Sequence, residues 1–300
     1  MRGTRTFCLP GGVRSPHVVR GSGNERPARA GRGAGVVMIR VGIGGWVFAP
    51  WRGTFYPKGL SQADELTYAS RHVTSIEINA TFYRTQSATS FRRWRDQVPD
   101  DFIFSIKGPR TATHRRVLND AAPSIERFLS SGILELGHKL GPILWQLPKT
   151  MRFNEPSITA FFALLPKRID QFGLRHVVEV GHESFVTPQF VTLARAHEIA
   201  IAFVDSAGHP AVGDVTADFV YARLRRSEEA EPTGYPQAAL DIWTKRFRAW
   251  ATGEEPSDVS RLQPETGSAP RERDCFVYFI SGAKVRAPAA AGALLERLGS

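Results

Sequence analysis

The chain of 300 residues is 42% hydrophobic and 23% charged, which is an ordinary composition for a globular protein. It contains no run of about 18 apolar residues, which excludes a transmembrane helix, and its length suffices for one large domain or two ordinary ones. Only two cysteines, Cys8 and Cys275, are present. They exclude a disulfide framework and a cysteine-based zinc site, and they favour a reducing, cytoplasmic location.

The formal net charge of +10 is concentrated in residues 1–37, which carry seven arginines and a single acid, Glu25. This segment is rich in Gly and Pro and lacks apolar periodicity, which predicts a disordered basic tail. It could be a nucleic-acid arm, a targeting peptide, or the product of a mis-assigned start with Met38 as the true first residue. We favour the last interpretation, because a strand pattern begins directly at Met38.

Beyond this tail, short apolar runs alternate with stretches of helical pattern. The candidate strands cover residues 40–44, 73–79, 102–107, 142–146, 176–180, 200–205, 219–223 and 275–281. The candidate helices cover residues 61–71, 87–97, 123–136, 155–165, 188–197, 236–251 and 288–298. Several of these helices open with Ser or Pro, as helix starts do.

This alternation predicts a parallel sheet covered by helices. Eight strand–helix units over about 260 residues match the usual size of a (β/α)8 TIM barrel. An open, doubly wound sheet is the alternative, but no G-x-G-x-x-G motif follows the first strand. We therefore predict one TIM-barrel domain over residues 38–300, with a polar surface loop at about 252–274 before the last strand.

The second candidate strand alternates polar and apolar side chains toward its end. Because strand side chains alternate in direction, Ile76 and Ile78 should face the helices, while Glu77 and Asn79 should point into the barrel. Active sites of TIM barrels lie at the mouth, the face formed by the carboxyl ends of the strands. Glu77 and Asn79 are therefore predicted to lie at a candidate active site.

Other strands also end in polar side chains. Lys107, Gln146, Asp205 and Arg223 end four strands, and Glu179 is followed closely by His182. Glu77 and Glu179 could serve as a general acid and base, supported by Asp205 and His182. The same four residues are candidates for holding a divalent metal, although no metal-binding motif is present. Alternatively, buried ion pairs such as Glu77–Lys107 or Glu179–Arg223 would serve only packing.

The end of the last strand suggests a phosphate site. Ser281 and Gly282 precede an alanine-rich helix, and barrels often bind phosphate in the loops after their last two strands. Arg223 and Lys284 would stand beside such a cradle. The alternative is a tight turn with solvated cations.

Aromatic side chains gather after the first two strands. Trp46 and Trp51 follow the first strand, and Phe82 and Tyr83 follow the second. Aromatic faces beside arginines suit the stacking of sugars or bases. They suit a loop core equally well, with Trp51 and Phe55 packed under their own loop.

Taken together, these motifs resemble the domain-of-unknown-function-72 (YecE-like) family over residues 41–298. The resemblance is carried by Gly44-Gly45-Trp46, by the run from Trp51 to Pro57, by the run from Glu77 to Tyr83, by Lys107 with Thr113-His114, by the run from Leu144 to Pro148, and by Glu179 with His182. It implies a TIM-barrel fold and adds Tyr56 and His114 to the candidate ligand-binding residues. It implies no particular activity, and the architectural similarity to endonuclease-IV-type barrels is an analogy of fold.

The sequence departs from the family pattern in its second half. The usual arginine before the histidine is Gly181, and the usual tryptophan after it is Phe185. Arg225 stands where the family tends to have a histidine, and Ser281 lies where an Asn-rich turn is usual. These departures predict an altered substrate, an altered activity or a loss of activity.

The leading hypothesis is a hydrolase or phosphoesterase acting on a small phosphate-bearing ligand or a nucleic acid. Lys107, Arg223 and Lys284 would hold the phosphate, and the aromatic residues would stack the organic part. One alternative is a non-catalytic module that binds a nucleic acid or a sugar. Another is a carbohydrate enzyme similar to a sugar-phosphate isomerase, for which a Glu/Lys pair in a barrel would serve. A divalent metal is the only cofactor considered, and no membrane partner is expected.

Overall fold

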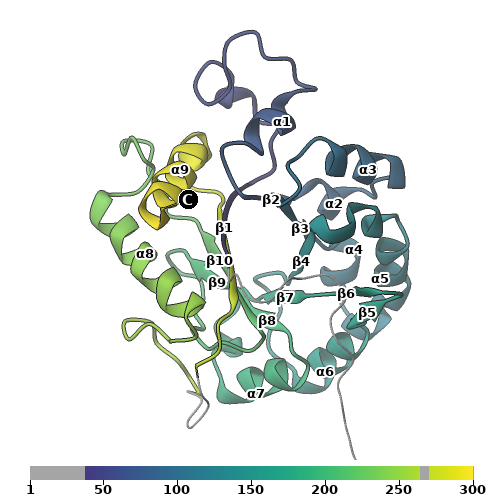
Figure 1. Ribbon diagram of the computed structural model, residues 1–300. Helices are drawn as coiled ribbons and strands as arrows, with labels where there is room; N and C mark the ends of the chain where they lie inside the picture. Colours follow the sequence, from purple (N-terminus) through teal and green to yellow (C-terminus); the bar gives the residue numbers. More distant parts are fainter. Residues whose placement is uncertain (1–37, 264–269, 300) are drawn as a thin grey trace, which may run out of the picture. The chain divides into compact units, whose positions relative to one another are not determined.

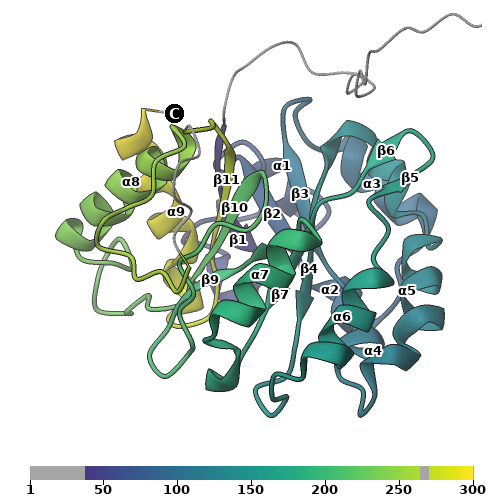
Figure 2. The same cartoon turned by 90° about the horizontal axis from the view of Figure 1, so that it is seen from below.

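A computed structural model describes residues 38–263 and 270–299, so the predictions for residues 1–37 lie outside the described part of the chain. Nine of the described strands run parallel and form a barrel-shaped sheet, which Figure 1 shows with helices around it and Figure 2 shows from a second direction. The strands of this sheet are β1 (Ile39–Gly44), β2 (Ser75–Ile78), β3 (Ile103–Lys107), β4 (Leu140–Gln146), β7 (His176–Glu179), β8 (Ala200–Ile201), β9 (Phe203–Asp205), β10 (Phe219–Leu224) and β11 (Asp274–Phe279).

The barrel closes through the segment that contains β8 and β9. The sheet order runs β8-β7-β4-β3-β2-β1-β11-β10-β9, so β8 and β9 stand at its two ends. Only Ala202 separates these two strands, and its N–H donates to the carbonyl of Val178 in β7 at 2.9 Å. Residues 200–205 therefore pair with β7 through their first half and with β10 through their second half. This segment is the sixth of the eight predicted strands, and the TIM-barrel prediction is confirmed.

Helices and short 3-10 turns connect the strands. The α-helices are α1 (Glu65–Ala69), α2 (Ala80–Tyr83), α3 (Ala88–Asp96), α4 (Arg110–Thr113), α5 (Ala122–Leu129), α6 (Glu155–Ala163), α7 (Pro188–Ala196), α8 (Gln237–Ala251) and α9 (Ala287–Leu298). The 3-10 helices are η1 (Ala49–Trp51), η2 (Leu118–Ala121), η3 (Ile133–Lys139), η4 (Glu183–Phe185) and η5 (Lys284–Arg286). A small antiparallel hairpin joins β5 (Arg168–Ile169) and β6 (Phe172–Gly173).

The sequence pattern predicts the long helices but not the short ones. The predicted helix at 61–71 is confined to α1, and α2 and α4 follow β2 and β3 without any predicted counterpart. Four-residue helices are too short to show an apolar periodicity, which explains why they escape prediction. No regular element lies in the described parts of the predicted loop, residues 252–263 and 270–273. None of the described helices is long and apolar enough to cross a membrane.

Two apolar cores stabilise the barrel. One lies between the sheet and the helices and includes Ile76 and Ile78, as the alternation of β2 predicts. The other fills the barrel interior and includes Leu144, Val177, Phe219, Tyr221, Phe276 and Tyr278. The interior is therefore packed with side chains below the mouth, as in other TIM barrels.

We predict that Gly42 in β1 tolerates no side chain. A Cβ atom at Gly42 would lie 2.1 Å from the carbonyl oxygen of Ser75 in the neighbouring strand, and this contact would force the strands apart. Gly42→Ala should lower the free energy of unfolding by about 2–3 kcal/mol in denaturant titrations followed by circular dichroism. Gly173→Ala is the control, because nothing lies within 4 Å of a Cβ there. Equal stability of the two variants would contradict the prediction.

Candidate functional site

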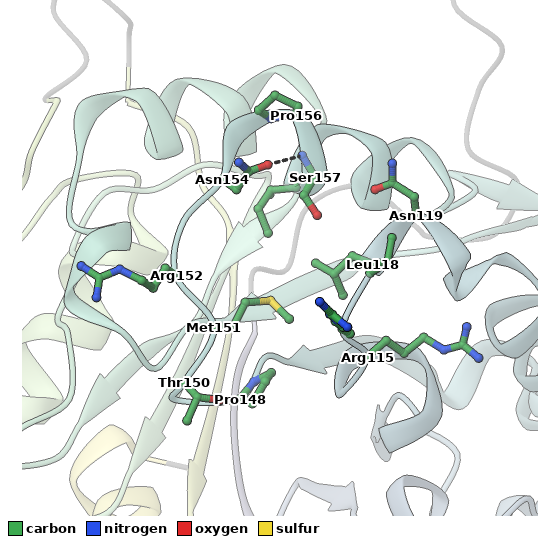
Figure 3. A pocket seen from close by; sticks show the side chains of 13 residues that line it. Arg115, Leu118, Asn119, Pro148, Thr150, Met151, Arg152, Asn154, Pro156 and Ser157 are labelled. Carbon is green, nitrogen blue, oxygen red and sulfur yellow. Dashed lines mark hydrogen bonds between the residues drawn. The ribbon is translucent and has the colours of Figure 1, made fainter.

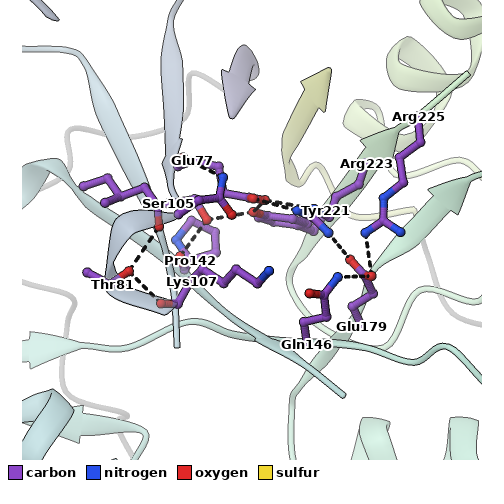
Figure 4. A network of polar contacts seen from close by, with 12 residues as sticks. Glu77, Thr81, Ser105, Lys107, Pro142, Gln146, Glu179, Tyr221, Arg223 and Arg225 are labelled. Atoms are coloured by element: carbon purple, nitrogen blue, oxygen red, sulfur yellow. Dashed lines mark hydrogen bonds and ion pairs between the residues drawn. The ribbon is translucent and has the colours of Figure 1, made fainter. Parts of the chain in front are cut away.

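Arg223 of β10 lies at the centre of a buried ionic network at the barrel mouth. Its Nε and Nη2 donate to the two carboxylate oxygens of Glu77 at 3.0 and 2.8 Å, and its Nη1 donates to Glu179 at 2.5 Å. Figure 4 shows the guanidinium between the two carboxylates. The three groups come from β10, β2 and β7, so this one side chain links three sides of the barrel.

Glu77 is sealed beneath this network. Its side chain is 0% exposed, and a third donor, the hydroxyl of Tyr221, lies 2.6 Å from its Oε2. Tyr221 lies two residues before Arg223 on the same inward face of β10. Glu77 therefore serves to fix Arg223 and is not placed to exchange protons with a ligand. It pairs with Arg223, not with Lys107 as one of the considered ion pairs predicts.

Glu179 is surrounded by donors on its outer side. Arg225 and Gln146 both donate to its Oε1 at 2.6 Å, and Nε2 of His209 lies 3.6 Å from the same atom. Burial opposes the charged form, but Arg223, His209, Arg225 and Gln146 together hold the pKa of this carboxyl well below its ordinary value. Glu179 is therefore a fixed negative charge.

Among the described residues, Lys107 of β3 is the one cation at this part of the mouth that does not pair with Glu77 or Glu179. It is 7% exposed, and among residues 38–263 and 270–299 no carboxylate oxygen lies within 4 Å of its ammonium. Burial lowers its pKa to about 8, the positive charge of Arg223 adds to this, and Glu77 and Glu179 oppose it. Figure 4 shows the side chain directed toward the Arg223–Glu179 pair without a bond to either.

Aromatic residues stand beside Lys107 at the rim of the mouth. Its Nζ lies 3.9 Å from the ring centroid of Phe82, which gives a cation–π contact. Phe82 in turn meets His114 at 5.3 Å and Tyr83 at 5.1 Å between ring centroids. The ring of Tyr83 projects into solvent, with 78% of its surface exposed. Asn79, also at the rim, is half-buried and donates to the backbone carbonyl of Glu77.

Two predicted catalytic residues lie apart from the network. Val204 belongs to the barrel interior, so its neighbour Asp205 points to the helix side, where it meets Tyr235 at 3.2 Å and Arg226 at 3.7 Å. Burial raises the pKa of Asp205. His182 accepts from the N–H of Ser184 and caps η4. Within the described part of the chain, no group of three or more His, Cys, Asp or Glu side chains is placed to hold a metal ion.

The aromatic loop after β1 is a core of its own. Trp51 and Tyr56 are buried, and Trp46 packs its ring against Trp94 and Phe104, so these three predicted ligand-binding residues support the loop. Trp51 donates its indole N–H to the carbonyl of Lys284 at 3.0 Å. The alternative interpretation, a packed loop core, thus describes Trp51 correctly.

The residues of the predicted phosphate cradle make contacts with other parts of the chain. Lys284 places its ammonium over the rings of Phe48 and Trp51, and burial lowers its pKa. Ser281 is exposed in a left-handed conformation, and the N–H of Ala283 donates to the carbonyl of Ser227. The segment is a strained turn, and the 3-10 helix η5 separates it from the start of α9.

Sequence reasoning misses Tyr221 and His209. Tyr221 could have been found, because it lies two residues before Arg223 in a strand and must share its face. His209 lies in the irregular segment after β9, where no periodicity indicates a direction. It approaches Glu179 only because the fold returns this segment over the mouth.

Residues 40–300 match the family described as "Protein of unknown function DUF72". The chain belongs to this family. It is 32% identical over 149 residues to UPF0759 protein YecE of Escherichia coli K12, a match that covers 49% of this chain and 50% of YecE. The match therefore spans about half the length of that curated relative.

Two solved DUF72 structures share the fold. A member from Thermotoga maritima MSB8 is 23% identical with a TM-score of 0.67, and the match covers 88% of this chain and 100% of that one. A member from Enterococcus faecalis V583 is 15% identical with a TM-score of 0.64, and the match covers 88% of this chain and 96% of that one. At these identities the structural likeness shows the barrel alone.

We predict that the Glu77–Arg223 pair contributes strongly to stability. Glu77→Gln leaves the buried guanidinium with one carboxylate, which should lower the free energy of unfolding by about 3 kcal/mol. Glu135→Gln removes a half-exposed partner of Arg92 and should change it by less than about 1 kcal/mol. Denaturant titration at pH 7 checks both, and similar losses in the two variants would contradict the buried network.

Lys107 should lower the stability of the fold at neutral pH. Its folded pKa of about 8 lies below the ordinary lysine value, so the charged form is penalised in the folded state below pH 8. Lys107→Met should therefore raise the free energy of unfolding by up to about 3 kcal/mol at pH 7. The gain should shrink to below about 1 kcal/mol as the pH rises toward 10, because the folded state then holds the lysine uncharged and the penalty fades as the pH approaches the unfolded pKa.

Denaturant titrations at pH 7 and pH 10 measure this gain. The exposed residue Lys58 supplies the control, because Lys58→Met should leave the stability nearly unchanged at both values. A Lys107→Met variant that is less stable than the wild type at pH 7 would show that the ammonium is satisfied in the folded state.

Proposed function

We propose that this DUF72 protein is a phosphoesterase that binds a small phosphate-bearing ligand at the mouth of its barrel through Lys107. The observation that carries the proposal is the ammonium of Lys107, which lies at the mouth without a carboxylate within 4 Å among the described residues. Arg223 and Arg225, by contrast, are both bound to carboxylates.

The charges of the network favour an anionic ligand. Lys107, Arg223 and Arg225 supply three cations, while Glu77 and Glu179 supply two anions. A buried charge without a partner is unfavourable, so a ligand with negative charge would complete the balance. Arg225 also keeps its buried Nε–H without an acceptor among the described residues, which leaves donor capacity on the same side as Glu179.

Lys107 is suited to act as a general acid. A pKa of about 8 keeps the ammonium mostly protonated at neutral pH and makes its proton easy to transfer. In phosphoester hydrolysis, water would attack phosphorus while the bond to the leaving oxygen breaks, and Lys107 would donate its proton to that oxygen. The attacking water would release a proton to solvent.

The fixed positive charges of Arg223 and Arg225 would supply the remaining stabilisation of the transition state. The transition state of phosphoryl transfer is loose, and catalysis depends mainly on positioning and on charges aimed at the phosphoryl oxygens. The carboxylates beneath Arg223 and Arg225 hold these guanidinium groups in place. This role replaces the acid/base role predicted for Glu77 and Glu179.

The proposal is tested with inorganic phosphate and with p-nitrophenyl phosphate and its diester as probes. Calorimetry should show phosphate binding that Lys107→Met weakens at least about 10-fold, while Lys58→Met leaves it unchanged. Turnover of the probe should fall by about 100-fold or more in Lys107→Met. It should also fall tenfold per pH unit above about 8 in the wild type, as the acid loses its proton.

The variants separate the competing activities. Unchanged phosphate affinity in Lys107→Met would overturn the proposal. Binding that depends on Lys107, without turnover of either probe, would favour the non-catalytic binding module. Lys107→Arg keeps the charge but cannot titrate near pH 8, so it should bind phosphate and lose the general-acid contribution.

A further inference from the structure

A groove of about 600 Å³ lies beside the mouth, between the segments that follow β3 and β4. Figure 3 shows Leu118 and Met151 facing each other across its middle, with Arg152 on one side and Arg115 on the other. Arg116 completes the set of arginines that line it. A volume of this size is in the range of small-molecule binding sites.

The arginines of this groove are not neutralised. No Asp or Glu side chain lines the groove. Arg115 donates to the backbone carbonyls of Thr111 and Asp120, which fixes its position without cancelling its charge. No carboxylate lies within 4 Å of Arg115, Arg116 or Arg152 in the described part of the chain. The groove is therefore an ordered, positively charged surface.

The excess of positive charge extends along this side of the barrel mouth. The three segments after β2, β3 and β4, residues 79–87, 108–121 and 147–154, contain one acid, Asp120. Six cationic residues lie on the same segments: Arg84, Arg110, Arg115, Arg116, Lys149 and Arg152. Clustered cations on one face are the usual electrostatic feature of a nucleic-acid site.

Aromatic rings connect the groove to the mouth. Lys107 lies over Phe82, and Phe82 contacts His114, whose neighbour in the chain is Arg115 of the groove. Tyr83 beside them is the most exposed of the large hydrophobic side chains identified on the surface. Single-stranded nucleic acids are bound by such combinations of cations, which follow the backbone, and aromatic faces, on which bases stack.

We infer that the groove binds a single-stranded nucleic acid, whose backbone follows Arg115, Arg116 and Arg152 and one of whose bases stacks on Tyr83. The inference rests on the proposed function and narrows the phosphate-bearing ligand to the phosphodiester backbone of a single-stranded nucleic acid. A duplex keeps its bases stacked inside, so it could not use the ring of Tyr83 in this way.

The test is fluorescence anisotropy with a labelled oligothymidylate of about ten nucleotides. The full chain is used, so the arginines of residues 1–37 are the same in every variant. The groove variant carries Arg116→Glu and Arg152→Glu. The control variant carries Arg71→Glu and Arg93→Glu, which make the same change of charge on exposed residues away from the groove.

The groove variant should bind the oligothymidylate at least about 10-fold more weakly than the control variant, with a salt slope reduced by about 1.4 for two lost phosphate contacts. Tyr83→Ala should weaken binding by about fivefold or more, and Tyr83→Phe should preserve it because the ring remains. Equal binding by the groove and control variants would overturn the inference. Preference for a duplex of the same length, or for polyglutamate, would also overturn it.

The two proposals fail separately. Lys107→Met tests phosphate binding at the barrel mouth, whereas the groove variant tests the binding of single-stranded nucleic acid. If Lys107→Met leaves phosphate binding unchanged while the groove variant still loses the oligonucleotide, the proposed function fails alone. If the groove variant binds the oligonucleotide as the control variant does while Lys107→Met loses phosphate, the inference fails alone.

Discussion

The bridge from Arg223 to Glu77 and Glu179 is the interaction on which the site depends. Three charged groups are buried at the mouth of a packed barrel, and taking such groups out of water is unfavourable unless each finds partners. Arg223 donates two hydrogen bonds to Glu77 and one to Glu179, so all three of its nitrogen atoms are engaged. The two carboxylates also neutralise the charge of the guanidinium. Because β2, β7 and β10 supply these groups, the register of the closed sheet and the ionic network support each other.

This bridge also decides what the remaining groups can do. With both carboxylates bound to guanidinium groups, neither is free to neutralise Lys107. Burial of the ammonium, together with the positive charge of Arg223, then lowers its pKa to about 8. The same arrangement that stabilises the network therefore creates an unneutralised cation at the mouth. Residues that strain a fold in this way are commonly found where a ligand binds.

Much of the fold and part of the site could be predicted from the sequence. Strict alternation placed Ile76 and Ile78 against the helices and Glu77 inside the barrel, because the period of a strand fixes directions locally. The hydrogen-bond and ion-pair partners of each side chain could not be predicted, because they depend on which strands are neighbours and on the register between them. Asp205 shows the limit: it ends its strand as expected, but Val204 takes the inward direction.

One of the departures from the family pattern, Arg225, lies on the same network. Arg225 stands where the resemblance implies a histidine, and it donates to Glu179 at 2.6 Å. Gly181 stands where an arginine is implied, and a Cβ there would lie 2.8 Å from the side chain of Lys149, on a segment that borders the groove. Relative to the pattern that the resemblance implies, one cation is absent at 181 and one is added at 225, both close in sequence to the ends of the strands that hold Glu179 and Arg223. Relative to the implied pattern, the positive charge of the mouth is redistributed rather than removed, so we expect a change of ligand geometry and not a loss of anion binding.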